Sequence, residues 1–433
     1  SQQNRSDLKY FFEPASVAVF GSLREGLGLG YGVIRNMLQF GYSGKIYPVS
    51  PYQNGDVLGF KAYSTVDDVA DPIEGAIVIT PPPTVPGIVE QCARKGVKAV
   101  TIVSENFAEA GGDGLKYQQQ LVEIVRRTGI RIIGPNTVGL FNAANGFITN
   151  PYLIVQKNIR KGGIAYCSQS GIVGAQGQPL KDEAYPISKM CDLGNKCDVN
   201  EVDLLNYLVN DPETSVIAMH IEDIKDGHRF IDTVQKVATH KPVLLLKPGR
   251  TERGSKASAS HTGSLAGNER IYDAAFRQSG AIRLNTWREF WEIPRIFVNQ
   301  PLPGGNRIAV ITFTGGVGVA AVDAAEEGGL TIADFSPSTI SKLSKLSPQL
   351  ASNPVDLGPI IPVTPDPLPV LEQTIAAVID DPNIDCVTAT LYASTGAETP
   401  IFMDIFDRVM KNATKPVSIW IYGTELAAIE ELS

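Results

Sequence analysis

The segment "ASVAVFGSLREGLGLGYGVIRNM" (residues 15–37) decides the fold class. Its first six residues form a short apolar run that is typical of a buried parallel strand. A glycine-rich turn follows this run and opens a helical pattern. A strand that enters such a turn and continues into a helix is the start of a doubly wound α/β domain, so we expect a parallel sheet beginning near residue 15.

Similar apolar runs recur along the chain, separated by longer helical patterns. We predict further strands at 45–50, 75–80, 98–103, 131–134, 216–222, 242–249, 386–393 and 416–423. The strand-to-turn pattern restarts at "GIAYCSQSG" (163–171) and at "RIAVITFTGGVG" (307–318), and "NQPLPGGN" (299–306) reads as a turn-rich linker. The sequence therefore predicts three α/β domains, at 1–145, 146–298 and 299–433.

Composition narrows the class of protein. Of the 433 residues, 43% are hydrophobic and 19% are charged, as in an ordinary folded protein, and the net charge of −8 argues against nucleic-acid or anionic-membrane partners. The five cysteines form no CxxC pair, so neither a disulfide framework nor a metal site is expected. Because the chain shows no signal-peptide pattern and no 18-residue apolar run, we expect a cytoplasmic protein.

The first turn is a candidate anion site. Its glycines let the backbone approach a pyrophosphate, and the N–H groups at a helix start attract anions, although a purely steric turn has the same composition. A dinucleotide site usually adds an acidic residue after the second strand. Here that strand continues as "YPVSPYQNGD" (47–56), in which Asp56 is poorly placed, and this disfavours NAD.

Two later turns carry polar side chains. Ser168, Gln169 and Ser170 follow a predicted strand, and Asn136 follows the last predicted strand of the first domain. Their hydroxyl and amide groups suit a phosphate or an acyl group, although ordinary turn and cap chemistry explains either turn alone.

His261 stands in "SKASASHTGSLAGNE" (255–269), among residues too small to bury its ring. Such neighbours admit a tetrahedral anion, and a neutral imidazole attacks an activated phosphoryl group when a partner fixes its tautomer. Glu222, at the end of the predicted strand 216–222, is the candidate partner. We interpret His220, on the same strand, as a core or edge residue.

Five motifs together resemble a known family: "SHTGSLAG" (260–267), "SQSG" (168–171), "GPNTVG" (134–139), "GNKCDVNEVDLLNYL" (194–208) and "IEDIKDG" (221–227). In order and spacing they are similar to the α part of the NDP-forming acyl-CoA synthetases, closest to the ADP-forming acetate–CoA ligase type, which is related to succinyl-CoA synthetase. The resemblance covers nearly the whole chain and implies a Rossmann-like CoA-binding domain followed by two flavodoxin-like domains.

The resemblance also implies the site residues. His261 would be phosphorylated, Glu222 would orient it, and Asn136 would lie beside the acyl phosphate. Phosphate would be held by Ser168, Gln169, Ser170 and Gly171. Coenzyme A would be held by Gly21, Ser22, Leu23, Arg24, Ser50, Pro51, Thr80, Pro81, Pro82, Ser104 and Glu105, which come from the first turn and from the segments 47–52, 79–92 and 104–111. The implied reaction is acid + CoA + ATP = acyl-CoA + ADP + phosphate, reversible through acyl phosphate and phosphohistidine.

The first turn departs from the family pattern. Leu23 replaces a hydroxyl residue, Gly28 stands where a lysine is usual, and Ser50 and Tyr52 stand where asparagine and lysine are usual. The backbone cradle is kept, and Arg24 is available to supply the missing positive charge.

No segment resembles an ATP-grasp domain, and the chain stops at "GTELAAIEELS" (423–433). We therefore expect a separate β subunit or a C-terminal half to bring ADP or ATP with Mg²⁺, in an α₂β₂ or similar assembly acting on a carboxylic acid. Two alternatives stay open: a non-catalytic CoA-binding regulatory relative, and an NAD-dependent oxidoreductase.

Overall fold

The computed structural model describes residues 8–53, 55–152, 160–171, 185–251, 253–254, 269–393, 398–411 and 413–423. Contacts divide the chain into two compact units, Ser1–Val298 and Asn299–Ser433. Each unit is an α/β structure built on parallel sheets, which confirms the predicted fold class.

The first sheet has five parallel strands in the order β2-β1-β5-β6-β7. The strands are β1 (Ser16–Gly21), β2 (Lys45–Val49), β5 (Gly75–Ile79), β6 (Ala99–Ile102) and β7 (Arg131–Ile133). The hairpin β3 (Asp56–Val57) and β4 (Phe60–Lys61) follows β2, and the helices are α1 (Lys9–Phe12), α2 (Leu29–Gln39), α3 (Val85–Lys95) and α4 (Gly112–Thr128). All five predicted strands of this region are present.

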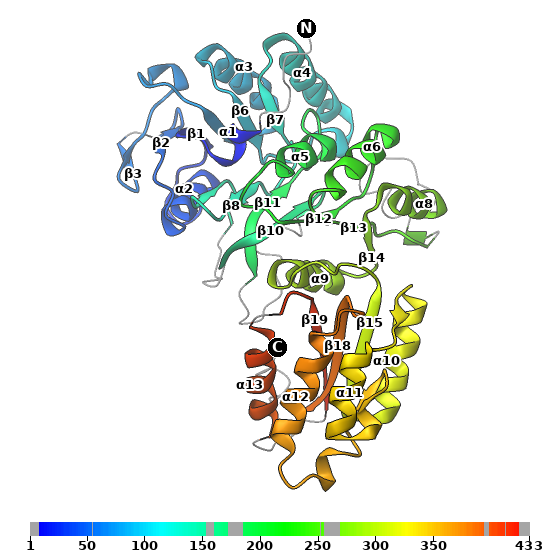
Figure 1. Ribbon diagram of the computed structural model, residues 1–433. Coiled ribbons are helices and arrows are strands. Elements are labelled where there is room, and N and C mark those ends of the chain that lie inside the picture. The colour runs from blue at the N-terminus through cyan, green and yellow to red at the C-terminus, as the bar shows by residue number, and fades with distance from the viewer. Residues whose placement is uncertain are drawn as a thin grey trace. The chain divides into compact units, whose positions relative to one another are not determined.

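Alternation along β1 explains why helices cover both faces of this sheet. Val17 and Val19 share one core with α2, whereas Ala18 and Phe20 share another core with α3 and α4. Successive side chains of a strand point to opposite faces, so a continuous apolar run requires cover on both sides. Figure 1 shows α3 and α4 together over the first sheet.

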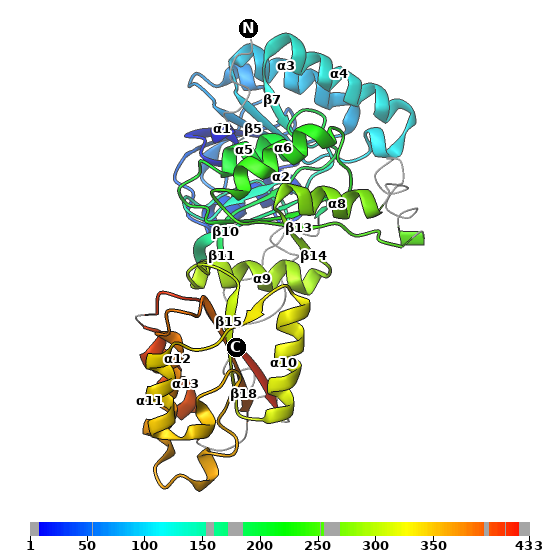
Figure 2. The same cartoon turned by 45° about the vertical axis from the view of Figure 1, so that its right-hand side comes forward.

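The second sheet has the order β14-β13-β12-β10-β11-β8-β9. Its parallel strands are β10 (Arg160–Ser168), β11 (Pro186–Asp192), β12 (Val216–His220), β13 (Val243–Leu246) and β14 (Ile282–Leu284), and the antiparallel strands β8 (Leu140–Asn142) and β9 (Phe147–Ile148) complete the edge. The helices are α5 (Glu201–Leu208), α6 (Gly227–Ala238), α8 (Glu269–Ser279) and α9 (Trp287–Asn299). In Figures 1 and 2, α5 and α6 lie side by side.

The two sheets share one core. Side chains of α2 and of the second sheet belong to a single buried cluster, and Phe40 and Tyr42 pack against Phe141 and Phe147 with ring centroids 5.0 Å apart in each pair. This packing explains why the first 298 residues form one compact unit. Separate domains at 1–145 and 146–298 remain a prediction.

The second unit contains a parallel sheet with the order β16-β15-β18-β19, and β17 also pairs with β15. Its strands are β15 (Arg307–Thr312), β16 (Thr331–Ile332), β17 (Val355–Asp356), β18 (Cys386–Ala393) and β19 (Val417–Gly423). Figure 2 shows α10 (Gly315–Glu327) on one side of β15 and β18, and α11 (Pro337–Leu346), α12 (Pro367–Ile379) and α13 (Glu398–Met410) on the other.

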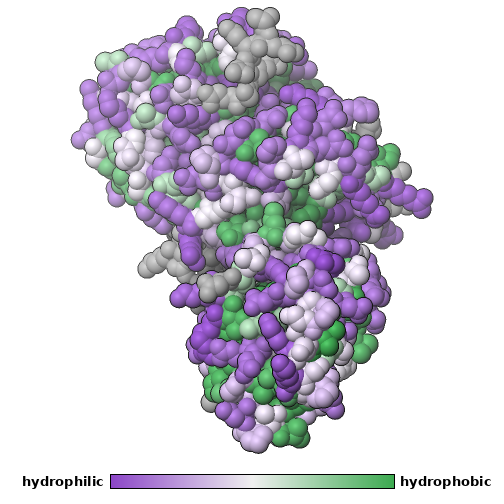
Figure 3. All heavy atoms as spheres, in the orientation of Figure 1, coloured by the Kyte–Doolittle hydropathy of each residue, from purple (hydrophilic) through white to green (hydrophobic). Residues whose placement is uncertain are grey.

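Hydrophilic side chains cover most of the face shown in Figure 3, with small apolar groups between them. Among the helices that the structure describes, none is both long and apolar enough to cross a membrane.

Candidate functional site

A pocket of about 760 Å³, called pocket A here, opens at the carboxyl ends of β1, β2 and β5. After β2 the chain crosses to the other side of β1 to form β5, so the strand order reverses beside β1. Ligands of open α/β sheets bind at this reversal, and cofactor pockets have volumes of about 300–1,000 Å³. Pocket A has the position and the size of a cofactor site.

The turn between β1 and α2 forms one wall of pocket A. Gly28 precedes α2 as its N-cap and offers no side-chain cap, and the first N–H groups of a helix have no partner within the helix. A Cβ atom at Gly28 would lie 2.2 Å from the backbone oxygen of Ser22, so no side chain fits at this position. The lysine that the family usually carries here is therefore excluded by the path of this turn.

Leu23 and Ser50 show what replaces the missing side chains. Leu23 lines the pocket but is only 4% exposed and belongs to the apolar core, so it forms an apolar floor beneath the turn. Ser50 is also buried, and its hydroxyl lies 3.4 Å from the backbone nitrogen of Tyr52, whose own side chain is 94% exposed. The turn after β2 thus offers a small hydroxyl group and no charge.

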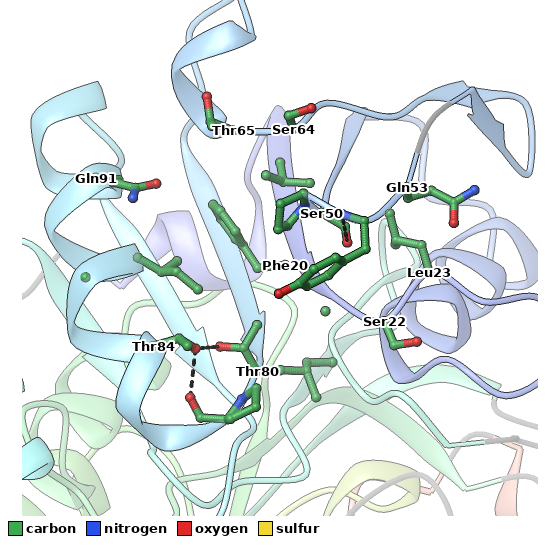
Figure 4. A pocket seen from close by; sticks show the side chains of 18 of the residues that line it. Phe20, Ser22, Leu23, Ser50, Gln53, Ser64, Thr65, Thr80, Thr84 and Gln91 are labelled. Carbon is green, nitrogen blue, oxygen red and sulfur yellow. Dashed lines mark hydrogen bonds between the residues drawn. The ribbon is translucent and has the colours of Figure 1, made fainter.

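Figure 4 shows polar side chains entering pocket A from several segments. Thr80 and Thr84 lie with their hydroxyl oxygens 2.8 Å apart, and Gln91 of α3 comes from the same side. Of the described residues that line the pocket, Arg24 is the one charged side chain and none is acidic. Pocket A can therefore hold an anionic ligand against hydroxyl groups, backbone N–H groups and one guanidinium.

Eight of the eleven residues predicted for coenzyme A line pocket A: Gly21, Ser22, Leu23, Arg24, Ser50, Pro51, Thr80 and Pro81. The other three, Pro82, Ser104 and Glu105, are not among its lining residues. Ser64 and Thr65, which follow the β3–β4 hairpin, line the pocket but were missed by the sequence analysis. The β3–β4 hairpin brings these two residues back to the pocket, and no local sequence pattern predicts that position.

Ser104 lies behind pocket A and connects it with the second sheet. Its hydroxyl accepts a hydrogen bond from the backbone N–H of Thr80 at 3.0 Å and donates to the Thr80 carbonyl at 2.7 Å. Its own carbonyl accepts from the N–H of Asn136 at 2.9 Å. Ser104 therefore hydrogen-bonds both to Thr80 in the wall of pocket A and to the turn that carries Asn136.

A second, smaller pocket, called pocket B here, lies at the carboxyl ends of β10, β11 and β12. Its volume is about 50 Å³, and its described lining residues are Asn136, Gln169, Gly194, Asn195, Lys196, Glu222 and Asp223. Three of these, Asn136, Gln169 and Glu222, are residues predicted for the phosphate and acyl chemistry. The fold therefore brings them together although they lie up to 86 positions apart in the sequence.

Gln169 holds the backbone that carries Glu222. Its amide oxygen accepts from the backbone N–H of Glu222 and, at 2.8 Å, from that of Asp223, while its amide nitrogen donates to the Asp223 carbonyl at 2.9 Å. These bonds occupy the side chain of Gln169, so its effect on pocket B is to place Glu222.

Ser168 is turned away from pocket B. Its side chain is fully buried, and its oxygen lies 2.9 Å from Nδ1 of His220 and accepts from the N–H of Ser170 at 2.9 Å. His220 is 1% exposed and packs on Trp287 with ring centroids 4.8 Å apart, as expected for a core residue. Ser168 therefore shapes the turn from beneath, whereas Ser170 and Gly171 are partly exposed.

Asp192, at the end of β11, ties two turns of pocket B together. Its carboxylate accepts from the N–H of Val138 at 2.8 Å and from that of Gly194 at 3.1 Å. Burial raises the pKa of this carboxyl to about 6, with a smaller contribution from the negative charge of Glu222, and the two N–H donors oppose that rise. No sequence motif indicated a role for Asp192.

His261 lies outside the described residues, so its predicted position beside Glu222 stays a prediction. The strand that precedes its loop, β13, ends at Leu246. Burial lowers the pKa of Lys247, the next residue, and its ammonium lies 4.9 Å from the ring centre of Tyr272. Within the described part of the chain, no group of three or more histidine, cysteine or acidic residues is arranged to hold a metal ion.

Two family models match the segments of the chain that contain these pockets. Residues 15–143, which contain pocket A, match the family model "CoA binding domain". Residues 161–297 match the model "Succinyl-CoA ligase like flavodoxin domain". The alpha subunit of acetate–CoA ligase [ADP-forming] II from Pyrococcus furiosus is 40% identical over 400 residues, covering 90% of this chain and 85% of that subunit.

This chain belongs to the ADP-forming acetate–CoA ligase family. Acetate–CoA ligase [ADP-forming] II of Archaeoglobus fulgidus is also similar, at 36% identity over 96% of this chain. The chain spans only 62% of the length of that ligase. The resemblance inferred from the sequence motifs is thus confirmed.

Solved structures agree with the family assignment. The acetyl-coenzyme A synthetase 1 of Ca. Korarchaeum cryptofilum, solved in complex with phosphate and ADP, superposes with a TM-score of 0.88 at 30% identity and covers 98% of this chain and 91% of its own. A protein from Pyrococcus horikoshii OT3 superposes with a TM-score of 0.81 at 32% identity, covering 98% and 92%. Both confirm the α/β architecture of this ligase family member.

Proposed function

We propose that this chain is the α part of an ADP-forming acyl-CoA synthetase, which interconverts acid, CoA and ATP with acyl-CoA, ADP and phosphate. The observation that carries the proposal is pocket A, which lies at the strand reversal, has one cationic and no acidic lining residue, and lies within the matched CoA-binding segment. A pocket for NAD would need a carboxylate near the end of β2, where Ser50 and Pro51 stand instead.

Coenzyme A suits the chemistry of pocket A. The backbone N–H groups of the turn that lines the pocket, from Gly21 to Arg24, favour its pyrophosphate, and the guanidinium of Arg24 favours a phosphate by charge. Apolar side chains of Phe20, Ile79 and Ile88 line the same pocket and suit the flat face of an adenine ring.

Pocket B suits the steps that follow thioester binding. An oxygen of inorganic phosphate forms a bond to the thioester carbon, the carbon–sulfur bond breaks, and the CoA sulfur leaves with the electron pair and takes up a proton. A nitrogen of His261 then bonds to phosphorus, and the carboxylic acid leaves as a carboxylate. Glu222, held by Gln169, would fix the tautomer of His261, and Asn136 would contact the acyl group.

Phosphohistidine must next pass its phosphoryl group to ADP. We infer that an ATP-grasp β subunit or a C-terminal half supplies the nucleotide site with Mg²⁺. Two observations support this inference: the Pyrococcus furiosus relatives are named as alpha subunits, and the chain spans about half of several other relatives. An α₂β₂ or similar assembly and a cytoplasmic location complete the proposal.

The test of the proposed function is ligand-dependent stabilisation of the chain. Added CoA should raise the melting temperature, because a ligand at about a hundredfold its dissociation constant adds roughly 2.7 kcal/mol to the unfolding free energy. NAD and NADP, measured at the same concentrations, should produce no comparable rise. A rise with NAD and none with CoA would instead favour the oxidoreductase alternative.

A further inference from the structure

Lys196 lies in pocket B, and none of the roles proposed so far uses it. It follows β11 in the turn that leads to α5, and the whole residue is 7% exposed while lining the pocket together with Asn136, Gln169 and Glu222. Lysine is almost never this deeply buried unless it is paired. A buried ammonium at the edge of a reaction pocket requires a reason.

The ammonium of Lys196 is held in place from one side. It donates to Oε2 of Glu201 at 3.1 Å and to the backbone carbonyl of Asp223 at 2.7 Å, and Oδ1 of Asp223 lies 3.8 Å away. An ammonium has three N–H donors. Among the described residues, its hydrogen-bond partners are Glu201 and the Asp223 carbonyl. One N–H of the ammonium is therefore left for the pocket that Lys196 lines.

The charge around pocket B makes this donor important. Glu222 and Asp223 line the pocket, Glu201 lies against Lys196, and Asp192 lies beneath. Phosphate would meet several carboxylates here, and like charges repel each other more strongly in a protein pocket than in bulk water. Lys196 is the cationic side chain among the described lining residues of pocket B, and it offsets that repulsion.

The backbone conformation of Lys196 also indicates a functional role. Its φ angle is +53°, a left-handed conformation that glycine adopts easily and that a long side chain adopts at a cost. Asn136, which also lines the pocket, has a φ of +60°. Residues other than glycine with such positive φ angles cluster at functional sites, where the interactions of the side chain outweigh the backbone strain.

We propose, on the basis of the proposed function, that Lys196 binds the reacting phosphate in pocket B by donating its third N–H to a phosphoryl oxygen. The same contact would follow the phosphoryl oxygens through acyl-phosphate formation. A charge-assisted hydrogen bond at a desolvated site is about twice as strong as a neutral one. The competing explanation is that Lys196 serves only to hold the turn through Glu201.

Substitutions separate these explanations. Lys196→Met should weaken binding of inorganic phosphate, measured by calorimetry on the CoA-bound chain, by about tenfold or more. Lys196→Arg, which keeps the charge, should restore part of that loss. Lys241→Met removes an equal charge from a partly buried lysine that donates to the carbonyls of Leu208 and Asp211, so it should leave phosphate binding unchanged.

Glu201→Gln provides the decisive comparison. It removes the carboxylate that pairs with Lys196 but keeps the ammonium, so phosphate should bind as in the wild type or more tightly. If Lys196 only holds the turn, Glu201→Gln should weaken phosphate binding as much as Lys196→Met does. That result would overturn the inference.

The double variant Lys196→Met/Glu201→Gln leaves no unpaired buried charge and is used if Lys196→Met fails to fold. It should show the same loss of phosphate binding. Acetate is measured in parallel, and a loss confined to acetate would contradict the phosphate assignment. A wild-type chain that fails to bind CoA would count against the proposed function, whereas intact CoA binding with undiminished phosphate binding in Lys196→Met would overturn the inference alone.

Discussion

Asp192 shows how a single buried carboxylate can shape a reaction pocket. It accepts from the N–H groups of Val138 and Gly194, which belong to two turns far apart in the sequence, and Asn136 and Lys196 stand in those same turns. Because burial raises its pKa to about 6, Asp192 is protonated in part near neutral pH. Its ionisation therefore couples the stability of the fold to pH.

Asp192→Asn should change the pH dependence of stability. The folded state holds the proton of Asp192 more tightly than the unfolded state, so this residue contributes stability at low pH that is lost as pH rises through about 6. Relative to the variant, the wild type should lose roughly 2 kcal/mol of unfolding free energy between pH 4.5 and 7.5. Urea unfolding of both proteins across this range measures the difference, and parallel curves would refute the shifted pKa.

The motifs predicted which residues gather at pocket B better than they predicted what each side chain does. "SQSG" and "GPNTVG" do meet at the carboxyl ends of the strands, where a Cβ on Gly171 would lie 2.8 Å from Val138. Ser168 nevertheless faces His220, since that contact depends on β12, which pairs with β10 from 52 positions away. Long-range strand pairing of this kind cannot be read from a local motif.

At the scale of elements, the β1–α2 turn explains the departure from the family pattern. Gly28 lies where the backbone of Ser22 leaves no room for a Cβ, and Gly32 packs in the same way against the carbonyl of Pro151. Close approach of this helix to neighbouring backbone thus excludes a side chain at both positions. The positive charge comes from Arg24 in the same turn.

Gly28→Ala should distort this turn. The added methyl group would meet the Ser22 oxygen at 2.2 Å, so we expect CoA affinity to fall by about tenfold and the unfolding free energy to fall by about 1–3 kcal/mol. Gly227→Ala is the matched control, because a Cβ there meets nothing within 4 Å. CoA titration and urea unfolding check both variants, and unchanged CoA binding by Gly28→Ala would remove this turn from the site.

Most of the longer strands were predictable, but the seven-residue β11 was missed, because Lys189 and Asp192 interrupt its apolar pattern. The apolar runs at 15–20, 45–50 and 75–80 all form strands at nearly those positions. The strands β8 and β9 were missed because three and two residues carry no periodic pattern, and they form by pairing with β11 and with each other. Tertiary packing against α2 stabilises them.

At the scale of the whole molecule, the shared core of residues 8–298 places both pockets in one compact unit. Ser104 bonds to Thr80 beside pocket A and to Asn136 in pocket B, so the two sites are joined by direct hydrogen bonds. A thioester bound in one pocket and a phosphate bound in the other would thus be held within one compact unit. The proposed reaction requires this chain to carry the phosphoryl group between substrates.

Phosphorylation of His261 tests this claim most directly. The chain is incubated with acetyl-CoA and radiolabelled inorganic phosphate, without nucleotide. We expect an acid-labile, base-stable label on His261, because the proposed acyl phosphate would form and transfer its phosphoryl group within this chain. Glu222→Gln should slow the labelling by about 10²-fold, since the imidazole would lose its fixed tautomer, and His261→Ala should abolish it. A label that persists in His261→Ala and maps to another residue would contradict the account.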